Sequence, residues 1–463
     1  MPTGDRSASQ IIGAEPAGRR ALLGWVLFDW ASQPFYTLVV TFLFAPYFVN
    51  GFMADPDRGA ALWAYATGIA ELIAALAAPV LGAVTDTGLP RKPWIAGFSV
   101  LLVTGLCGLW LAAPGETHLV PFVLIAFGLA IVGAELATVF TNAMMSSLVS
   151  GRRLGTLSGT GWAAGYVGGL LSLVLFAGLL VADPATGKTL LGLKPLLPLD
   201  PATREGDRLV GPFSALWYLV FVLPLFLYTP DRPPGPRQAR AVSTWFAQLL
   251  RSLRELVREH GQVALFLLAR MLYADGLGAV FAFGGIYAAT VFGWGALELG
   301  LFGIVLTIAG TIGAFLGGPL DDRLGSKTVI IGGLLLFIAG SIGVLSVDQT
   351  HVLFAIPVEA KLAGSAPFSS AGEQVLLGFG VLIGIASGPV QASSRTLLAR
   401  MCPPEKITEF FGFFSFSGKI TAFAAPLAIG AVTHATGSQR IGIASCVVFL
   451  VAGLLLLFRV KAR

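Results

Sequence analysis

Long apolar segments recur along almost the whole chain, and they restrict it to one structural class. Each is long enough to cross the hydrocarbon core of a bilayer, which takes about 20 predominantly apolar residues in a helix. The ten-residue alternation that is typical of membrane β-barrels is not seen. The sequence therefore predicts an all-α integral membrane protein with twelve transmembrane helices, at 21–49, 60–84, 93–113, 119–148, 156–182, 213–229, 262–292, 297–320, 328–347, 374–398, 407–433 and 440–459.

The charged residues are few, and their distribution predicts the orientation of the chain. Only 12% of the residues are charged, whereas soluble domains have about 25%. Most of the 30 Lys and Arg residues fall in connections on the side of the N-terminus. The positive-inside rule then places both termini in the cytoplasm. We expect a multi-pass protein of the cell (inner) membrane, with the lipid bilayer as a partner and no nucleic acid.

The cysteines and histidines give no sign of a cofactor. The three cysteines have no CxxC spacing, and the four histidines are far apart in sequence. A metal-dependent membrane enzyme needs ligands that converge on one point. We therefore predict no metal site, no cofactor and no enzymatic activity.

Six predicted spans lie on each side of residues 231–260, which divides the chain into two halves. We predict an N-terminal six-helix half at 1–230, a cytoplasmic linker at 231–260 and a C-terminal six-helix half at 261–463. The linker starts with a Pro-rich stretch. Apolar residues then recur at helical spacing beside Arg251, Arg254 and Arg258, which predicts a basic amphipathic helix on the inner membrane face. A solvated linker helix is the alternative.

A repeated motif supports this division. GAVTDTGLPRK follows the second span and GPLDDRLGSK follows the eighth, and each has a glycine, an aspartate four positions later and basic residues in a turn. Glycine lets helices approach closely, and an aspartate at a helix end can pair with basic groups or cap a partner helix. We predict a cytoplasmic gate, with a turn and topology signal as the alternative. Its residues are Gly82, Asp86, Arg91 and Lys92 in the first copy and Gly318, Asp322, Arg323 and Lys327 in the second.

The two copies resemble the loop motif of the major facilitator superfamily, although the first has Thr87 where the second has Arg323. Three further stretches resemble its vacuole-effluxer-like branch, whose bacterial members are called the unknown major facilitator family. They are GWVLFDWASQPFYTLVVTFLFAPYF, RRLGTLSGTGWAAGYVGG and GPVQASSRTLLARMCPPEKITEFFGFFSFSGKITAFAAP. The chain departs from that branch after Asn142, where AMMSSLV follows and the family tends to have Pro. The resemblance implies a secondary transporter of two pseudo-repeated six-helix halves, with amino-acid efflux assigned to the fungal vacuolar relatives.

A polar face in the first span contains the first candidate site residue, Asp29. Asp29, Ser32, Gln33 and Tyr36 fall at i, i+3, i+4 and i+7 and share one side of a helix. A carboxylate inside a membrane is costly, so this face belongs against a bundle interior or a water-filled cavity. Asp275 lies in the equivalent seventh span. The two carboxylates are predicted to bind protons or the ammonium group of a substrate, and pairing with Arg270 is the alternative for Asp275.

Two more carboxylates lie within spans. Glu71 is in the second span, and Glu135 in the fourth shares a face with Thr138 and Asn142. An apolar environment favours the protonated carboxyl, which suits reversible proton binding. Either could instead neutralise a basic residue during the transport cycle.

The predicted cationic partners lie in the tenth and eleventh spans. Gln391 and Arg395 are spaced i, i+4, as are Ser415 and Lys419, so both cations are expected on polar helix faces. Arg395 is near enough to the cytoplasmic end to snorkel, which is its alternative role. Lys419 is predicted to receive a substrate carboxylate or to pair with a carboxylate of the N-terminal half, with Asp29 working across the central cavity.

An aromatic pair in the fifth span, Trp162 and Tyr166, is predicted to line the cavity. Together these features favour a monomeric alternating-access permease that moves a small polar solute by proton-coupled efflux, with amino acids as the substrate class that the resemblance suggests. A Gly-rich nucleotide loop is not seen, so ATP is not the expected energy source. The alternatives are a transport-like membrane sensor and a membrane-embedded enzyme without transport.

Overall fold

The computed structural model describes residues 17–181, 186–233, 245–361 and 365–461. The chain forms two compact units, which we describe separately. Unit 1 comprises 1–150, 164–245 and 404–415, and unit 2 comprises 151–163, 246–403 and 416–463. Each unit thus includes a short segment from the other half of the sequence. The domain boundaries predicted from the sequence, 1–230, 231–260 and 261–463, follow the two halves of the chain and stay a prediction.

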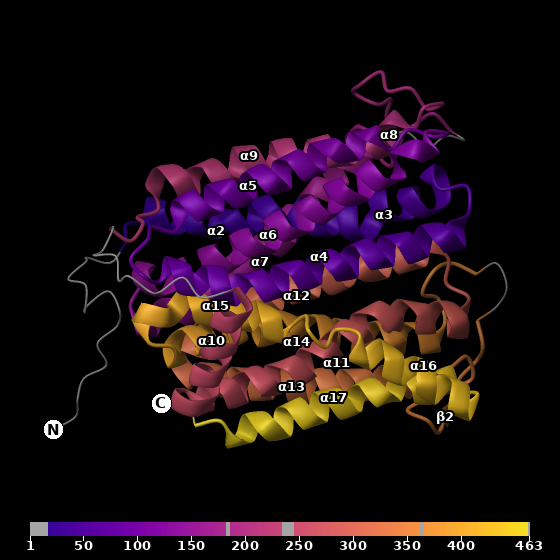
Figure 1. The fold of residues 1–463 in the computed structure, drawn as a ribbon. Helices are drawn as coiled ribbons and strands as arrows, with labels where there is room; N and C mark the ends of the chain where they lie inside the picture. Colours follow the sequence, from indigo (N-terminus) through magenta and orange to yellow (C-terminus); the bar gives the residue numbers. More distant parts are fainter. Residues whose placement is uncertain (1–16, 182–185, 234–244, 362–364, 462–463) are drawn as a thin grey trace. The chain divides into compact units, whose positions relative to one another are not determined.

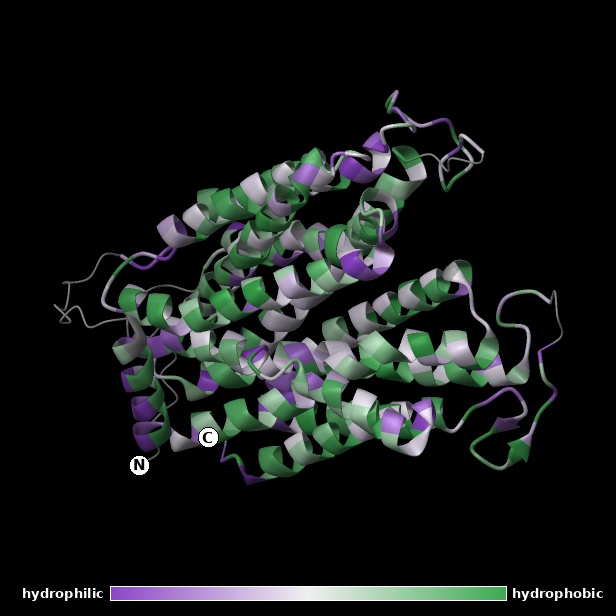
Figure 2. Ribbon diagram, turned by 45° about the vertical axis from the view of Figure 1, so that its right-hand side comes forward, coloured by the Kyte–Doolittle hydropathy of each residue, from purple (hydrophilic) through white to green (hydrophobic). Residues whose placement is uncertain are grey.

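Helices account for nearly all of the described structure, and they confirm the predicted fold class. Among the described residues, 11 helical segments are long and apolar enough to cross a membrane. Figure 2 shows that hydrophobic residues dominate the long helices. These segments are Arg19–Phe52, Pro56–Thr85, Lys92–Leu111, Thr117–Leu148, Gly151–Leu179, Glu205–Tyr228, Gly261–Phe292, Leu297–Leu324, Ser326–Leu345, Ala371–Met401 and Gln439–Arg459.

Unit 1 is built from long helices that pack in pairs. α2 lies against α9, α5 lies against α6, and α4 lies against α6 (Figure 1). An indole anchors the first of these helices, because Nε1 of Trp25 donates a 2.7 Å hydrogen bond to the carbonyl oxygen of Thr141 on α6. The helices are α2 (Arg19–Pro34), α3 (Phe44–Tyr47), α4 (Pro56–Thr85), α5 (Lys92–Gly108), α6 (Val120–Leu148), α8 (Glu205–Arg208), α9 (Val210–Tyr228) and, from residue 164, α7 (Leu154–Leu179).

The first span changes its helical geometry at Pro34. Proline has no N–H to bond the carbonyl four residues earlier, and the indole Nε1 of Trp217 donates to that carbonyl, on Trp30, at 3.2 Å. The chain continues as a π-helix, η1 (Phe35–Phe42), and after α3 as a second one, η2 (Phe48–Phe52). Such wider turns are frequent at functional sites. Tyr36 therefore lies in a widened helical turn, directly after the regular α-helix ends.

Unit 2 is also built from long helices that pack in pairs. α12 and α13 both lie against α14, and α11 lies against α17 (Figure 1). A short antiparallel pair, β1 (His351–Val352) and β2 (Ile356–Pro357), follows α13. The helices are α11 (Gly261–Phe292), α12 (Ala296–Leu324), α13 (Ser326–Leu345), α14 (Ala371–Met401), α16 (Ala424–Thr436), α17 (Gln439–Arg459) and the first part of α7.

The eleventh span is not one helix, so the prediction of a continuous segment at 407–433 is wrong. α15 (Ile407–Ser417) ends before a run of turns, and α16 begins at Ala424. Pro426 cannot donate to the carbonyl of Ala422, and Gly418 has a low helix propensity. Lys419 therefore lies in an irregular segment, and its predicted place on a helix face with Ser415 is also wrong.

The linker contains a helix at the expected place, α10 (Trp245–Glu259). Leu249 and Leu256 are buried, whereas all three predicted arginines are exposed. The arrangement is amphipathic, and contact with a membrane surface remains a prediction. The Pro-rich part of the linker at 234–244 lies outside the described residues.

The segment between the predicted spans 156–182 and 213–229 is described from residue 186 onward. Arg208 fixes its end, because Nε donates a 2.8 Å hydrogen bond to the carbonyl oxygen of Trp110 and the guanidinium lies 4.5 Å from the centre of that indole ring. The part of the loop after residue 185 thus has defined structure where it joins α9.

Candidate functional site

Three polar side chains from the first, second and fourth spans come together in unit 1. The Tyr36 hydroxyl donates a 3.1 Å hydrogen bond to Oε1 of Glu135 on α6. Glu71 on α4 is close enough to act electrostatically on the same hydroxyl. We call Tyr36, Glu71 and Glu135 the acidic cluster. Two carboxylates and a phenol thus lie in one region inside membrane helices, where ionisable residues are rare and make a candidate functional site.

The remaining polar residues of the first span lie beside α7. A Cβ added at Gly165 would lie 3.5 Å from Cβ of Asp29 and 3.4 Å from Oε1 of Gln33. These are ordinary van der Waals distances, so α7 packs beside the two polar side chains at this position. The Ser32 hydroxyl is used locally, since it donates to the carbonyl oxygen of Phe28 at 3.0 Å. Asp29, Gln33 and Tyr36 therefore stay the candidate site residues of the predicted stripe.

Two further predicted residues of unit 1 occupy the neighbouring helices. Asn142 is buried on α6, two turns after Glu135, and Tyr166 is half-buried on α7. Trp162, one turn before Tyr166, is counted in unit 2. The predicted aromatic pair is therefore divided at the point where α7 passes from one unit to the other.

Arg395 in unit 2 is buried, with a relative exposure of 1%. Its Nε donates to Oγ of Ser158 at 2.9 Å and its Nη2 to the carbonyl oxygen of Ser158 at 2.7 Å. The guanidinium carbon lies 5.5 Å from the centre of the Trp162 ring. The snorkelling alternative is therefore wrong, because this side chain binds the start of α7 instead of reaching for water. Gln391, one turn earlier on α14, is half-buried.

The irregular segment that holds Lys419 lies against α11. Nη1 of Arg270 donates to Oγ of Ser417 at 3.1 Å. Asp275 on α11 is buried, with a relative exposure of 5%. Arg270 acts electrostatically on the Asp275 carboxyl, and pairing between these two residues stays a prediction.

The first copy of the repeated motif caps a helix within unit 1. Oδ2 of Asp86 accepts hydrogen bonds from the backbone N–H groups of Thr408 and Glu409, both at 2.9 Å, in the first turn of α15. Arg91 supports this contact, since Nη2 lies 3.7 Å from Oδ1 of Asp86 and Nε donates to Oγ1 of Thr408 at 3.0 Å. Burial raises the pKa of Asp86 above its ordinary value, against the opposing influence of Arg91 and the two N–H groups.

The second copy of the motif also caps the start of a helix, α7, within unit 2. The carboxylate of Asp322 accepts from the backbone N–H groups of Gly155 at 2.7 Å and Thr156 at 2.8 Å, in the first turn of α7. Its basic partner is Arg400 of α14, whose Nη2 lies 3.1 Å from Oδ1 of Asp322. Nη1 of Arg400 also lies 2.6 Å from Oδ1 of the neighbouring Asp321.

The other basic residues of the motif have different places. Arg323 is exposed. It follows Asp322 directly, and adjacent residues on a helix point in different directions, so Arg323 does not share the face on which Asp322 contacts α7. Lys327 donates to the carbonyl oxygen of Val460 at 2.7 Å. In the first copy, Lys92 donates to the carbonyl oxygen of Phe226 at 2.9 Å. Arg400 and Asp321 were missed by sequence reasoning, since nothing in the motif's spacing points to the end of the tenth span.

The motif glycines make both contacts possible. A Cβ added at Gly82 would lie 2.5 Å from the carbonyl oxygen of Thr408, and one at Gly318 would lie 2.8 Å from the carbonyl oxygen of Gly155. Real Cβ atoms do not approach a backbone so closely, so each helix start is held against a surface that only glycine provides. The expected close approach of helices is found in both units.

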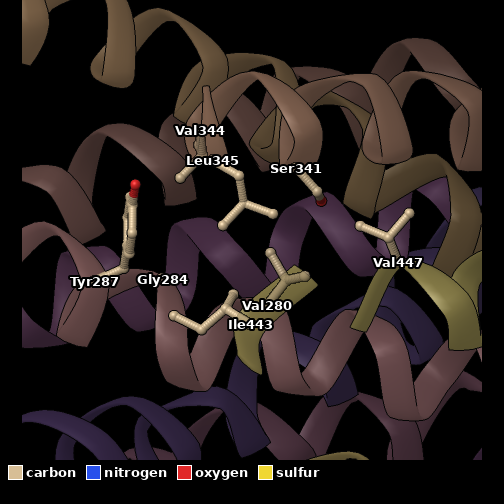
Figure 3. Close-up of a pocket in the computed structure, with 8 residues that line it drawn as sticks. All are labelled: Val280, Gly284, Tyr287, Ser341, Val344, Leu345, Ile443 and Val447. Carbon is tan, nitrogen blue, oxygen red and sulfur yellow. The ribbon is translucent and has the colours of Figure 1, made fainter. Parts of the chain in front are cut away.

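A pocket in unit 2 has a different character. It is lined by α11, α13 and α17, and its side chains are mostly aliphatic (Figure 3). Its cavity volume is about 20 Å³, and only the hydroxyl groups of Ser341 and Tyr287 bring polarity to the lining. A site for a charged solute needs several convergent polar groups, so we do not assign solute binding to this pocket.

Comparison with known proteins identifies the family. The profile of the vacuole effluxer Atg22-like family matches residues 152–463. The chain belongs to this family. A protein of Bacillus subtilis, the uncharacterized MFS-type transporter YxiO, is 23% identical over 94% of this chain and 93% of its own length. Autophagy-related protein 22 of Cryptococcus neoformans is 27% identical over 66% of this chain and 53% of its own, so the chain spans about half the length of that fungal relative.

Solved structures agree on the fold of this Atg22-like chain. The E. coli fucose:proton symporter FucP superposes with a TM-score of 0.70, covering 96% of this chain and 98% of FucP at 16% sequence identity. The fold is therefore that of the major facilitator superfamily, as the sequence predicted. Together with the family match, this makes the chain a multi-pass membrane protein and a secondary transporter.

Proposed function

We propose that this Atg22-like transporter moves a small polar solute out of the cell by proton-coupled alternating access, with amino acids as the leading substrate class. It acts as a monomer in the cell membrane, with both termini in the cytoplasm. The relatives support transport through their names, a vacuole effluxer and an MFS-type transporter. The observation that carries the proton-coupled part is the acidic cluster, because carboxylates within membrane helices mark ion or proton pathways by default.

Each unit holds residues with proposed roles. In unit 1, the acidic cluster exchanges protons, and Asp29, Gln33, Asn142 and Tyr166 are the proposed solute-binding residues. In unit 2, Gln391 and Lys419 are the proposed solute-binding residues, and Asp275 is a further proton site. Arg395 and Trp162 are positioning residues, since Arg395 holds the start of α7 through Ser158.

The repeated motif is the proposed gate. Its contacts are charge-assisted hydrogen bonds to two backbone N–H groups in each unit, on helices that continue into the other unit. Hydrogen bonds of this kind form and break without a covalent change, so they can stabilise one conformation and be released in another.

A solute screen in proteoliposomes tests the proposal. The protein is reconstituted, radiolabelled amino acids and other small polar solutes are offered one at a time, and flux is measured with and without an imposed pH gradient. We expect at least one solute to move faster when the gradient drives it. Asp29→Asn and Lys419→Ala should insert normally and lose that flux, whereas the exposed Asp57→Asn should retain it. Absence of flux for every solute would favour the sensor or enzyme alternatives.

A further inference from the structure

The carboxyl group of Asp275 is buried without a hydrogen-bond partner. Its relative exposure is 5%, and within the described residues neither of its oxygens has a donor in hydrogen-bond geometry. The same holds for the hydroxyl of Thr421, in the irregular segment of the eleventh span. The Thr421 hydroxyl lies near enough to act on this carboxyl as a hydrogen-bond donor but outside the geometry of a formed hydrogen bond, and Arg270 acts on the carboxyl electrostatically. A buried polar group without a partner is costly, so this one calls for a functional explanation.

Packing holds Asp275 where it is. A Cβ added at the next residue, Gly276, would lie 2.8 Å from Cγ of Leu450 on α17. On another side of α11, the hydroxyls of Tyr273 and Ser394 of α14 are 2.7 Å apart. α11 is thus fixed against both neighbouring helices, and it cannot turn to expose the carboxyl without losing these contacts.

The segment opposite Asp275 is the part of this region that can change. Between α15 and α16, the N–H groups of Lys419 and Ile420 both donate to the carbonyl oxygen of Phe416, at 3.1 and 3.0 Å, and Ala422 N–H donates to Lys419 at 3.2 Å. These are tight turns in place of a regular helix. In secondary transporters, broken helices are where coupling ions and substrates bind, because free backbone groups and side chains meet there.

We propose that Asp275 carries the coupling proton and that its proton controls the conformation of residues 418–423 through Thr421. This inference rests on the proposed transport function, and it assigns to unit 2 a proton site of its own beside the acidic cluster of unit 1. When a water-borne proton binds, the new Asp275 O–H donates to Oγ1 of Thr421. When the proton leaves to water, the carboxylate remains and the Thr421 hydroxyl donates to it or turns away.

The charges around Asp275 favour a proton over a metal cation. Arg270 lies on the same helix and acts on the carboxyl, Lys419 lies two residues before Thr421, and Cys446 of α17 and Ser394 of α14 are uncharged neighbours of this part of α11. A divalent metal ion would add two positive charges beside Arg270 and would need several oxygen ligands. A proton adds one positive charge, which neutralises the carboxylate, and it needs only that group.

An infrared pH titration of the full chain in lipid nanodiscs tests the protonation directly and needs no solute. Wild type should show a carbonyl band of protonated carboxyl groups that is reduced by one group in Asp275→Asn, and Thr421→Val should shift the pH at which that group titrates. Identical bands in wild type and Asp275→Asn at all pH values would overturn the proposal. If Asp275→Asn does not fold, Asp275→Glu replaces it, and its band should be displaced from that of wild type.

A transport assay tests the coupling. For a solute found in the screen, Asp275→Asn should keep exchange at equal pH but lose flux driven by the pH gradient by about tenfold or more. Unchanged pH-driven flux, or flux that follows a sodium gradient instead, would contradict the assignment. If wild type transports no solute, the proposed function fails, and the infrared titration still decides whether Asp275 binds a proton.

Discussion

The Tyr36 hydroxyl donates a 3.1 Å hydrogen bond to Glu135, and it does so from a π-helical turn. Pro34 ends the regular pattern of α2 just before this turn, and the widened helix then carries Tyr36 at its start. A hydrogen bond from a phenol to a carboxylate is charge-assisted and stronger than one between neutral groups. The local irregularity of the first span and the chemistry of the fourth are therefore linked.

Removing either partner of this hydrogen bond should slow transport. A hydrogen bond to a charged group contributes about 1.5–3 kcal/mol, so Tyr36→Phe and Glu135→Gln should each reduce pH-driven flux by roughly tenfold or more. Because they remove the same interaction, the double variant should be little slower than the slower single one. The measurement is initial flux in proteoliposomes with equal amounts of inserted protein.

The exposed Tyr65→Phe in α4 is the matched control and should transport like wild type, since Tyr65 is 68% exposed. Additive losses in Tyr36→Phe and Glu135→Gln would show that the two side chains act independently, and the acidic cluster would then not work as a unit.

The aspartates that cap α15 and α7 should contribute to stability in proportion to the hydrogen bonds they accept. Each accepts two backbone N–H groups at a helix start, and loss of an N-terminal cap costs about 1 kcal/mol. Asp86→Ala and Asp322→Ala should therefore lower the thermal unfolding temperature of the purified protein. Glu116→Ala, an exposed substitution outside these contacts, should not. Unfolding temperatures equal to wild type in both variants would mean that the caps do not stabilise the structure measured.

A single methyl group at Gly82 should be destabilising, although alanine is usually the better helix residue. The added Cβ would meet the carbonyl oxygen of Thr408 at 2.5 Å, so α15 would have to move away. Gly68 lies in the same helix, and a Cβ there would have nothing within 4 Å. Gly68→Ala should therefore be neutral or stabilising by up to about 1 kcal/mol. Thermal unfolding compares the two variants, and equal effects would contradict the close packing of α4 and α15.

The length and apolar character of the segments were enough to predict the all-α membrane class and most of the spans. Apolar segments of this length admit one architecture in a membrane, and the repeated motif marked the ends of α4 and α12 because glycine and aspartate have clear physical roles there. The irregular eleventh span was not predictable in the same way. Its residues are as apolar as those of a continuous helix, and the break depends on how Gly418 and Pro426 pack in three dimensions.

The site was less predictable than the fold, because its contacts join residues far apart in sequence. Spacing along one helix brought Asp29, Gln33 and Tyr36 together, but it could not show that Tyr36 meets Glu135. Nor could it show that Arg400, and not Arg323, is the basic partner of Asp322. Neighbouring basic residues in a motif look equivalent in sequence, whereas only one side of a helix faces the partner.

A buried ion pair in unit 2 joins Glu373 to Lys361. Glu373 at the start of α14 is 0% exposed, and its Oε1 accepts from Nζ of Lys361 at 2.7 Å and from Nε1 of Trp294 at 2.8 Å. Removing one partner of a buried pair leaves the other charge uncompensated, which typically costs about 3–5 kcal/mol. Lys361→Met should therefore lower the thermal unfolding temperature strongly.

Two further variants separate the charge of this pair from its packing. Glu373→Gln combined with Lys361→Met removes both charges and should recover part of the stability that Lys361→Met alone loses. Lys188→Met, in an exposed part of another loop, is the control for removing a surface lysine and should behave like wild type. The contrary result would be a double variant that is less stable than Lys361→Met alone. It would mean that the Glu373 carboxylate stabilises α14 even without its cation. The hydrogen bonds of Glu373 to Trp294 and Ser370 would then contribute more stability than its pairing with Lys361.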